Sequence, residues 1–162
     1  MLVSGALAGL ILGLAIGREW RRIARLQVTW FPLLVAALTA RAAAPLVPPI
    51  ALPLYLAAIG GTSAVAAANW RLPGAVLIAL GSVLNLVVVG LNGAMPVDAA
   101  GLSTVGRRMP GDLLHESISS ATVLPFLADV VIIAPLQAAY SVGDIAIAVG
   151  AFLLSFLSLA RR

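Results

Sequence analysis

The side chains best suited to chemistry gather in one part of this sequence, between residues 98 and 144. This stretch holds the only histidine, His115, and five of the six acidic residues, which are Asp98, Asp112, Glu116, Asp129 and Asp144. Carboxylates and imidazole are the groups that proteins use for proton transfer and for binding metals or cationic ligands. A site built from ionisable groups is therefore expected in this stretch.

One short motif, Asp112-Leu-Leu-His115-Glu116, places two carboxylates beside the imidazole. On a helix these three residues would share one face, which suits an acid–base pair or part of a metal site. The alternative is a solvated loop whose charges pair with Arg107 and Arg108. One histidine and no cysteine cannot supply a common zinc site. We therefore expect no metal, no cofactor and no catalytic residue, and keep His115 as a candidate ligand-binding residue.

Two further carboxylates, Asp129 and Asp144, adjoin apolar runs. An ionisable residue inside an apolar segment is a functional candidate by default. The alternative for Asp129 is an ion pair with Arg41, at the end of an earlier apolar run. Asp144 follows Ser141 by three residues and precedes a long apolar run, which is the capping-box pattern of a helix start. Asp129, Asp144 and Arg41 are thus candidate ligand-binding residues, each with a structural alternative.

Two asparagines, Asn85 and Asn92, lie seven residues apart in an apolar run and so near one face of a helix. An amide in such a helix usually bonds a neighbouring helix. Lining a ligand cavity is the functional alternative, and both residues are kept as candidates for it.

A very apolar chain must position these residues. Of its 162 residues, 62% are hydrophobic and 10% charged, whereas soluble domains are about 45–50% apolar and about 25% charged. So few charges cannot cover a water-exposed surface. The sequence therefore predicts an all-α fold, a single integral membrane domain over residues 1–162 with the lipid bilayer as its solvent.

Five apolar runs are close to the length of a membrane span, about 17–25 residues: 2–17, 28–44, 50–69, 74–92 and 142–160. Residues 93–141 form a predicted outer loop that contains a sixth apolar run, 121–140. Its apolar side chains gain about 0.3–0.6 kcal/mol each, but Asp129 costs about 2.5–3.5 kcal/mol at mid-bilayer. We expect 121–140 to be re-entrant or to lie on the surface, and a sixth span is the alternative.

The first run carries glycine at every fourth position, Gly5, Gly9, Gly13 and Gly17. Residues four apart share a helix face, so these glycines predict a glycine zipper for close helix packing. The packing partner is another helix of this chain or, alternatively, a second copy or a membrane-protein partner.

Arginine distribution predicts the orientation, since cytoplasmic loops carry an excess of positive charge. The chain has no lysine, and its ten Lys or Arg residues are all arginine, in short groups at the ends of apolar runs. Five spans put seven of them on the cytoplasmic side (Arg18, Arg21, Arg22, Arg25, Arg71, Arg161 and Arg162) and leave Arg41, Arg107 and Arg108 outside. The N-terminus is then outside and the C-terminus cytoplasmic. This grouping differs from a phosphate-tracking surface, so no nucleic-acid partner is expected.

Several motifs together resemble a family of small bacterial membrane proteins catalogued as a domain of unknown function. They are Arg71-Leu-Pro-Gly74, Leu91-Asn-Gly-Ala-Met-Pro-Val97, Leu127-Ala-Asp129 and Tyr140-Ser-Val-Gly-Asp144, with Asn85 and His115 between them. The resemblance implies a multi-pass protein of the bacterial cytoplasmic membrane and a joint role for Asn92, His115, Asp129 and Asp144 on the outer side. It carries no activity.

Three functions are compatible with these patterns. The first, a non-enzymatic accessory subunit or small-ligand or lipid-binding protein with an extracytoplasmic site, is preferred. The alternatives are an outer-leaflet enzyme that acts on a lipid-linked substrate and a small oligomeric transporter.

Overall fold

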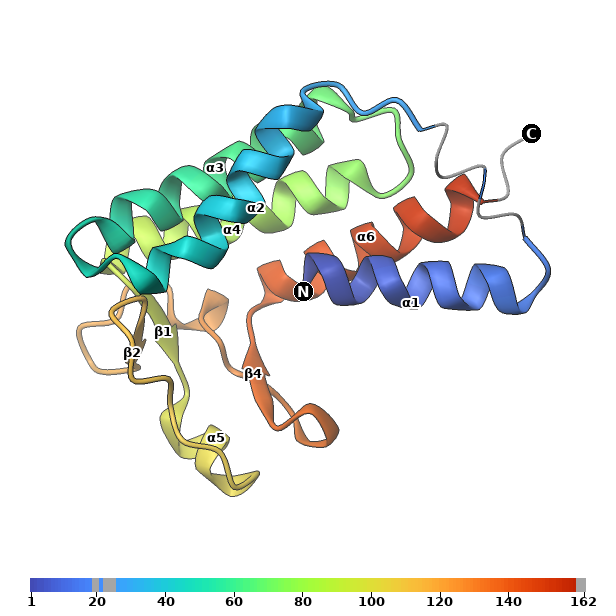
Figure 1. The fold of residues 1–162 in the computed structure, drawn as a ribbon. Helices are drawn as coiled ribbons and strands as arrows, with labels where there is room; N and C mark the ends of the chain where they lie inside the picture. The colour runs from blue at the N-terminus through green and yellow to red at the C-terminus, as the bar shows by residue number, and fades with distance from the viewer. Residues whose placement is uncertain (19–20, 22–25, 160–162) are drawn as a thin grey trace.

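The computed structural model describes residues 1–18, 21 and 26–159, and it is mostly helical (Figure 1). Five long helices form a row in which α1 packs on α6, α6 on α4, α4 on α3 and α3 on α2. Their bounds are Leu2–Ala15 (α1), Phe31–Ala43 (α2), Ala51–Ala68 (α3), Ala75–Asn92 (α4) and Val142–Ser158 (α6). One of these helices lies within each of the five apolar runs.

The α1–α6 contact depends on glycine. A Cβ atom added at Gly5 or Gly9 would collide with the backbone carbonyl of Ala148 or Phe152, and one at Gly13 would collide with the side chain of Leu159. Without these Cβ atoms, the two helices run side by side in backbone contact. In this structure the partner of the glycine stripe is therefore a helix of the same chain.

Gly17 does not belong to that packed stripe. Helix α1 ends at Ala15, and Gly17 adopts a left-handed conformation (φ 80°) with no atom within 4 Å of its Cβ position. Glycine tolerates positive φ at little cost and so commonly follows a helix end. The expectation that Gly17 packs a helix is wrong, and its role here is to end α1.

Glycines also bring α4 and α6 together. Gly81 faces the carbonyl of Gly143, and Gly74 faces the carbonyl of Gly150. Helix α6 is thus held closely on both sides, by α1 and by α4.

Residues 93–141 form a small module beyond the ends of the helices, where α4 ends and α6 begins (Figure 1). It contains strands β1 (Met95–Val97), β2 (His115–Ser117), β3 (Val131–Ile133) and β4 (Ala138–Tyr140), helix α5 (Ala99–Thr104) and two single 3₁₀ turns, Pro125–Leu127 and Ala134–Leu136. Strand β1 pairs in parallel with β2, and β3 pairs antiparallel with β4. We call this region the outer module.

The outer module corrects one expectation and excludes one alternative. Because it contains two small sheets, the fold is mostly helical rather than all-α. The run 121–140 is not a sixth helix, since it folds into 3₁₀ turns and the β3–β4 hairpin. Pro125 and Pro135 lack the N–H groups that a helix needs, and the backbone of Asp129 pairs instead with Pro96 and Asp98.

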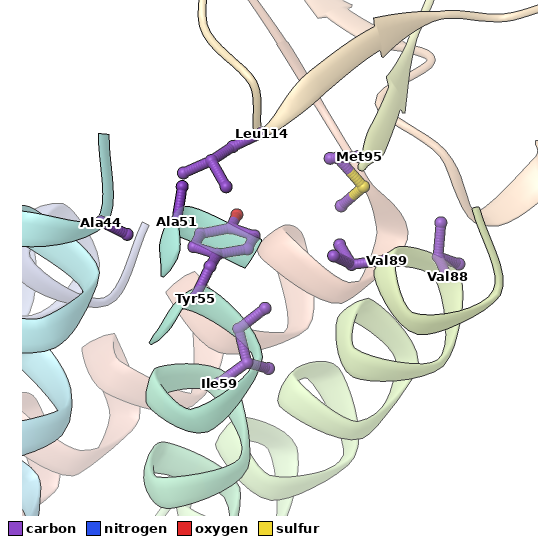
Figure 2. Packing of buried hydrophobic residues seen from close by; sticks show 8 residues of the cluster. All are labelled: Ala44, Ala51, Tyr55, Ile59, Val88, Val89, Met95 and Leu114. Atoms are coloured by element: carbon purple, nitrogen blue, oxygen red, sulfur yellow. The ribbon is translucent and has the colours of Figure 1, made fainter. Parts of the chain in front are cut away.

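An apolar cluster joins the outer module to the helices, with Met95 and Leu114 of the module facing Tyr55 of α3 and Val89 of α4 (Figure 2). All four side chains are buried. The remaining members are Ala44, Ala51, Ile59 and Val88. Burial of such side chains contributes about 1.5–3 kcal/mol each for the larger ones, so the module is fixed to this end of the helices.

Two helical segments are long and apolar enough to cross a membrane, Pro48–Ala68 and Ala75–Asn92. The other apolar helices, Leu2–Ala15, Phe31–Leu46 and Val142–Ser158, are shorter. The predicted number of five spans is thus not confirmed. The prediction of cytoplasmic arginines rests in part on Arg22, Arg25, Arg161 and Arg162, which lie outside the described residues.

Candidate functional site

A buried polar network forms where α4 meets the start of α6. Asn85 Nδ2 donates to Asp144 Oδ1 (3.1 Å), and Ser141 Oγ donates to Asn85 Oδ1 (2.8 Å). The backbone N–H of Asp144 donates to Ser141 Oγ (2.9 Å), so Ser141 caps α6 as expected. The Asp144 carboxylate accepts from Asn85 and does not reach back to the backbone of Ser141. Two predicted site residues, Asn85 and Asp144, are therefore direct partners.

Arg41 approaches this network from α2. Its guanidinium carbon lies 4.7 Å from the centre of the Tyr55 ring, a cation–π contact. Within the described residues no ion pair joins Arg41 to Asp129, although the two charges are near enough to interact. The Arg41–Asp129 ion pair, the structural alternative for Asp129, is thus not formed there, and the guanidinium stacks on Tyr55 of α3 instead.

A cavity of about 50 Å³ opens beside the network, and we call it the polar pocket. Arg41, Asn85 and Asp144 line it together with Ser82, whose side chain is 1% exposed and whose Oγ has no hydrogen-bond partner. The other lining residues are Met1, Leu2, Leu38, Ile59, Thr62 and Ile147. A buried hydroxyl without a partner is costly, at about 1–3 kcal/mol. Ser82 therefore offers an unused hydrogen-bonding group to whatever enters the pocket.

A second cavity, of about 90 Å³, adjoins the polar pocket, since Leu2 and Thr62 line both. We call it the apolar groove. Its walls are almost entirely aliphatic and come from α1, α3, α4 and α6 and from the region of α2, with Ala6, Leu34, Ala66, Ile78 and Leu154 among the lining residues. A polar cavity and a hydrocarbon-lined cavity thus lie next to each other between the helices.

A third cavity, of about 220 Å³, lies in the outer module, and we call it the outer cleft. Its polar lining residues are Arg107, Arg108, His115, Asp129 and Gln137. It shares no lining residue with the polar pocket.

Asp129 is the most deeply buried charge of the outer cleft, with 7% of the residue exposed. Its backbone is fixed by bonds to Pro96 and Asp98, and its Oδ1 has no hydrogen-bond partner. The pKa of Asp129 is raised to about 7, first because burial disfavours the charged form and second because Asp144 is negative; Arg41 and the Ser141 backbone lower it. This carboxyl can therefore bind a proton near neutral pH or interact with a cationic group.

His115 and Asp112 form an ionisable pair, with Nδ1 and Oδ1 2.7 Å apart. The same Asp112 oxygen accepts from the backbone N–H of Leu114 (2.9 Å). His115 and Glu116 lie on strand β2, where successive side chains point to opposite faces. The helical arrangement considered for Asp112, His115 and Glu116 is thus not formed, and Asp112 pairs with His115 rather than with the arginines of the loop alternative. Among the described residues, no three His, Cys, Asp or Glu side chains are placed to hold a metal.

Asn92 has a different role from Asn85. Its Nδ2 donates to the carbonyls of Val88 (2.8 Å) and Val123 (3.0 Å), while its Oδ1 accepts from the N–H of Val123 (2.8 Å). Asn92 therefore ties the outer module to the end of α4 and lines none of the three cavities.

Comparison with known proteins assigns the chain to a family. Residues 24–156 match a family of unknown function, DUF5317. The chain belongs to the DUF5317 family. The expected resemblance to a domain of unknown function is thereby confirmed. No curated protein and no solved structure matches the chain.

The DUF5317 match covers α2, α3, α4, the outer module and α6 as far as residue 156, so α1 lies outside it. It includes every lining residue of the outer cleft and all those of the polar pocket except Met1 and Leu2. Both cavities of this DUF5317 protein are therefore built mainly from the matched segment.

Sequence reasoning missed Ser82 and Gln137 as cavity residues. Ser82 precedes Asn85 by three residues, so both lie on one helix face, and two polar residues on one face of an apolar helix were a usable signal. Gln137 carried no such signal, because it reaches the outer cleft through the β3–β4 hairpin.

Proposed function

We propose that this DUF5317 protein is a multi-pass membrane protein that binds a lipid or lipid-linked molecule, with the polar group in the polar pocket and the chain in the apolar groove. The observation that carries the proposal is that the two cavities adjoin at Leu2 and Thr62, which line both. An amphiphile has a polar group joined to an apolar chain, and the two adjacent cavities offer a polar and an apolar environment for them.

The exterior of the helices supports a membrane location. On α4, Val76, Leu80, Val83, Val87 and Leu91 are exposed at spacings of three or four residues and so form one apolar face. Helix α1 exposes Val3, Leu7 and Ile11 in the same way. Contiguous apolar faces of this kind are rare on monomeric soluble proteins, and lipid would cover them.

Charge placement supports five spans in a bacterial cytoplasmic membrane. The five long helices carry only two charged residues, Arg41 in the last turn of α2 and Asp144 in the first turn of α6. Arg18, Arg21 and Arg71 lie at the end opposite the outer module. By the positive-inside rule, we propose that the outer module lies outside and the C-terminus is cytoplasmic. The β3–β4 hairpin would then be re-entrant or lie on the outer membrane surface. The shorter helices α1, α2 and α6 would require a thinned bilayer, at a modest cost.

The polar pocket supports ligand binding rather than packing alone. Ser82 Oγ is buried without a partner, and Arg41 brings a positive charge to the same cavity. A guanidinium binds phosphate or carboxylate groups well. We therefore propose a ligand whose head group carries an anionic group near Arg41 and an acceptor or hydroxyl for Ser82.

Native mass spectrometry of the protein purified in mild detergent tests this function. We expect the wild type to carry a stoichiometric lipid or lipid-linked molecule. Ser82→Leu fills the polar pocket and should remove that molecule, whereas Val83→Leu, on the exposed side of α4, should retain it. Ala6→Leu, which narrows the apolar groove from α1, provides a second test if Ser82→Leu fails to fold. Retention of the same ligand by both cavity variants would contradict the proposal.

The same preparation separates the other functions. A stoichiometric protein partner would make this chain an accessory subunit. A bound ligand that is chemically altered would indicate an enzyme, and a ligand that crosses the membrane of proteoliposomes would indicate a transporter.

The absence of native cysteine allows a direct topology test. In intact cells, a membrane-impermeant maleimide should label Ser120→Cys in the outer module and spare Trp70→Cys at the opposite end. The reverse labelling would overturn the orientation.

A further inference from the structure

The outer cleft contains charges of both signs that do not neutralise one another. Arg107 and Arg108 are exposed, and in the described part of the chain neither forms an ion pair. Asp129 lines the same cleft, is buried, and has an unpartnered Oδ1. The carboxylate of Asp112 is occupied by His115, which lines the cleft, at 2.7 Å. The two arginines therefore keep their full charge toward solvent, and the deep carboxyl keeps a free oxygen.

The position of the charges gives the cleft a direction. Asp129 is held by the backbone of β1 at the buried end, whereas the arginines follow α5 in an exposed segment. Gln137 adds an amide from the turn before β4. A positive group would thus fit inward and a negative group outward.

We infer that the outer cleft binds a small zwitterion that carries a primary amine and a phosphate, the chemistry of phosphoethanolamine. The ammonium group donates to Asp129, and the phosphate binds Arg107 and Arg108. Two guanidinium groups match the double charge and the acceptor geometry of phosphate better than those of a carboxylate. A cleft of about 220 Å³ is smaller than the pockets of drug-sized ligands, which begin at about 300 Å³, and suits a small molecule.

A metal ion is a poorer occupant of this cleft. A divalent cation would meet one carboxylate beside two guanidinium groups, whereas such ions prefer several oxygen ligands. Simple anions are also poorer, because they would leave Asp129 without a partner. A zwitterion satisfies both ends at once. The outer cleft shares no lining residue with the polar pocket, but Asp129 interacts with the charges of Asp144 and Arg41 there. Changes at Arg107 and Arg108 therefore separate this ligand from the proposed amphiphile.

The test is calorimetric titration of the protein in phosphatidylcholine nanodiscs with phosphoethanolamine, inorganic phosphate, ethanolamine and phosphocholine. We expect phosphoethanolamine to bind at least tenfold more tightly than each of the others. Phosphocholine should bind more weakly because its quaternary nitrogen has no N–H to donate to Asp129. This comparison uses the wild type alone and therefore does not depend on the folding of any variant.

Variants test which residues bind the phosphate and which bind the ammonium group of the zwitterion. The double variant Arg107→Gln/Arg108→Gln should lose at least tenfold in affinity for phosphoethanolamine and phosphate, whereas Arg71→Gln, at the opposite end of the helices, should lose nothing. Asp129→Asn should weaken phosphoethanolamine at least fivefold and leave phosphate unchanged or tighter. Equal binding of phosphoethanolamine and phosphate, or equal losses in the Arg71 control, would overturn the inference.

Nanodisc composition distinguishes a free ligand from a lipid head group. If a phosphatidylethanolamine head group fills the outer cleft, exchange of phosphatidylcholine for phosphatidylethanolamine will reduce the apparent affinity for added phosphoethanolamine. An unchanged affinity assigns the site to the free molecule. Both results support the same recognition chemistry, and absence of binding in both lipids would refute it.

Discussion

Asn85 on α4 donates a hydrogen bond to Asp144 on α6, although the two residues are 59 positions apart in the sequence. The contact is made at the N-terminal turn of α6, where Asp144 also complements the positive end of the helix dipole. Gly143 makes it sterically feasible, because a Cβ there would collide with Asn85 Oδ1. One amide thus fixes the position of a carboxylate on the wall of the polar pocket.

Asn85→Leu should destabilise the protein. The change removes the bonds to Asp144 and Ser141 and leaves Ser141 buried without its acceptor, a loss of about 1–3 kcal/mol for each orphaned group. The measurement is the free energy of unfolding in detergent by denaturant titration. Val83→Ala, on the exposed face of the same helix, is the control and should change little. A wild-type stability for Asn85→Leu would mean that the network is not stabilising.

Gly143→Ala and Gly90→Ala should have opposite effects. At Gly143 the new methyl group meets Asn85 Oδ1 and the carbonyl of Gly81, so α4 and α6 must separate, at about 1–3 kcal/mol. At Gly90 no atom lies within 4 Å, and alanine should gain about 0.5–1 kcal/mol from its helix preference. Melting temperatures of the two variants check this. Equal shifts would show that glycine packing does not determine the α4–α6 distance.

The helices were largely predictable from the sequence because local patterns specify them. Long apolar runs ended at Asn92-Gly93 and began at Ser141, and glycine after a helix and serine before one are local signals. The small sheets were not predictable. Met95 pairs with His115 and Val97 with Asp129, so three-residue strands take their partners from distant segments with no alternation to reveal them.

For the candidate site, the residue types in the sequence identified several site residues but did not reveal which of them form hydrogen bonds with each other. Asn85 and Asp144 each stood out as a polar group in an apolar setting, but the sequence could not show that they bond each other. Asn92 looked equivalent to Asn85 by spacing, yet it is the last residue of α4 and bonds Val123. Position along the helix, rather than the face alone, separated the two roles.

Asn92→Ala should loosen one attachment of the outer module without changing the polar pocket. The variant loses three hydrogen bonds, two of them to Val123. We expect faster amide hydrogen exchange over about residues 119–124, where exposed local structure opens most readily. Exchange at Asn85 and Asp144 should be unchanged. Faster exchange across all of α4 would instead mean that Asn92 supports the helix itself.

The pKa of Asp129, about 7 against an ordinary value of 3.8, makes stability depend on pH. The folded state binds this proton more tightly than the unfolded state does. The contribution of this proton to the free energy of unfolding is therefore fully present below about pH 4 and is lost as the pH rises through about 7. The loss is about 1.4 kcal/mol for each unit by which the pKa is raised. We expect the melting temperature of the wild type to fall between about pH 5 and pH 8.

Asp129→Asn identifies the group responsible, because the amide stays neutral at every pH. The melting temperature of this variant should be nearly independent of pH over that range. His115→Gln is the matched control in the same cleft and should keep the wild-type slope, since it leaves the Asp129 carboxyl in place. If Asp129→Asn kept the wild-type slope while His115→Gln lost it, the titrating group would be the imidazole. The buried carboxyl would then be ionised in the folded protein, and Asp129 would need a cationic partner even without ligand.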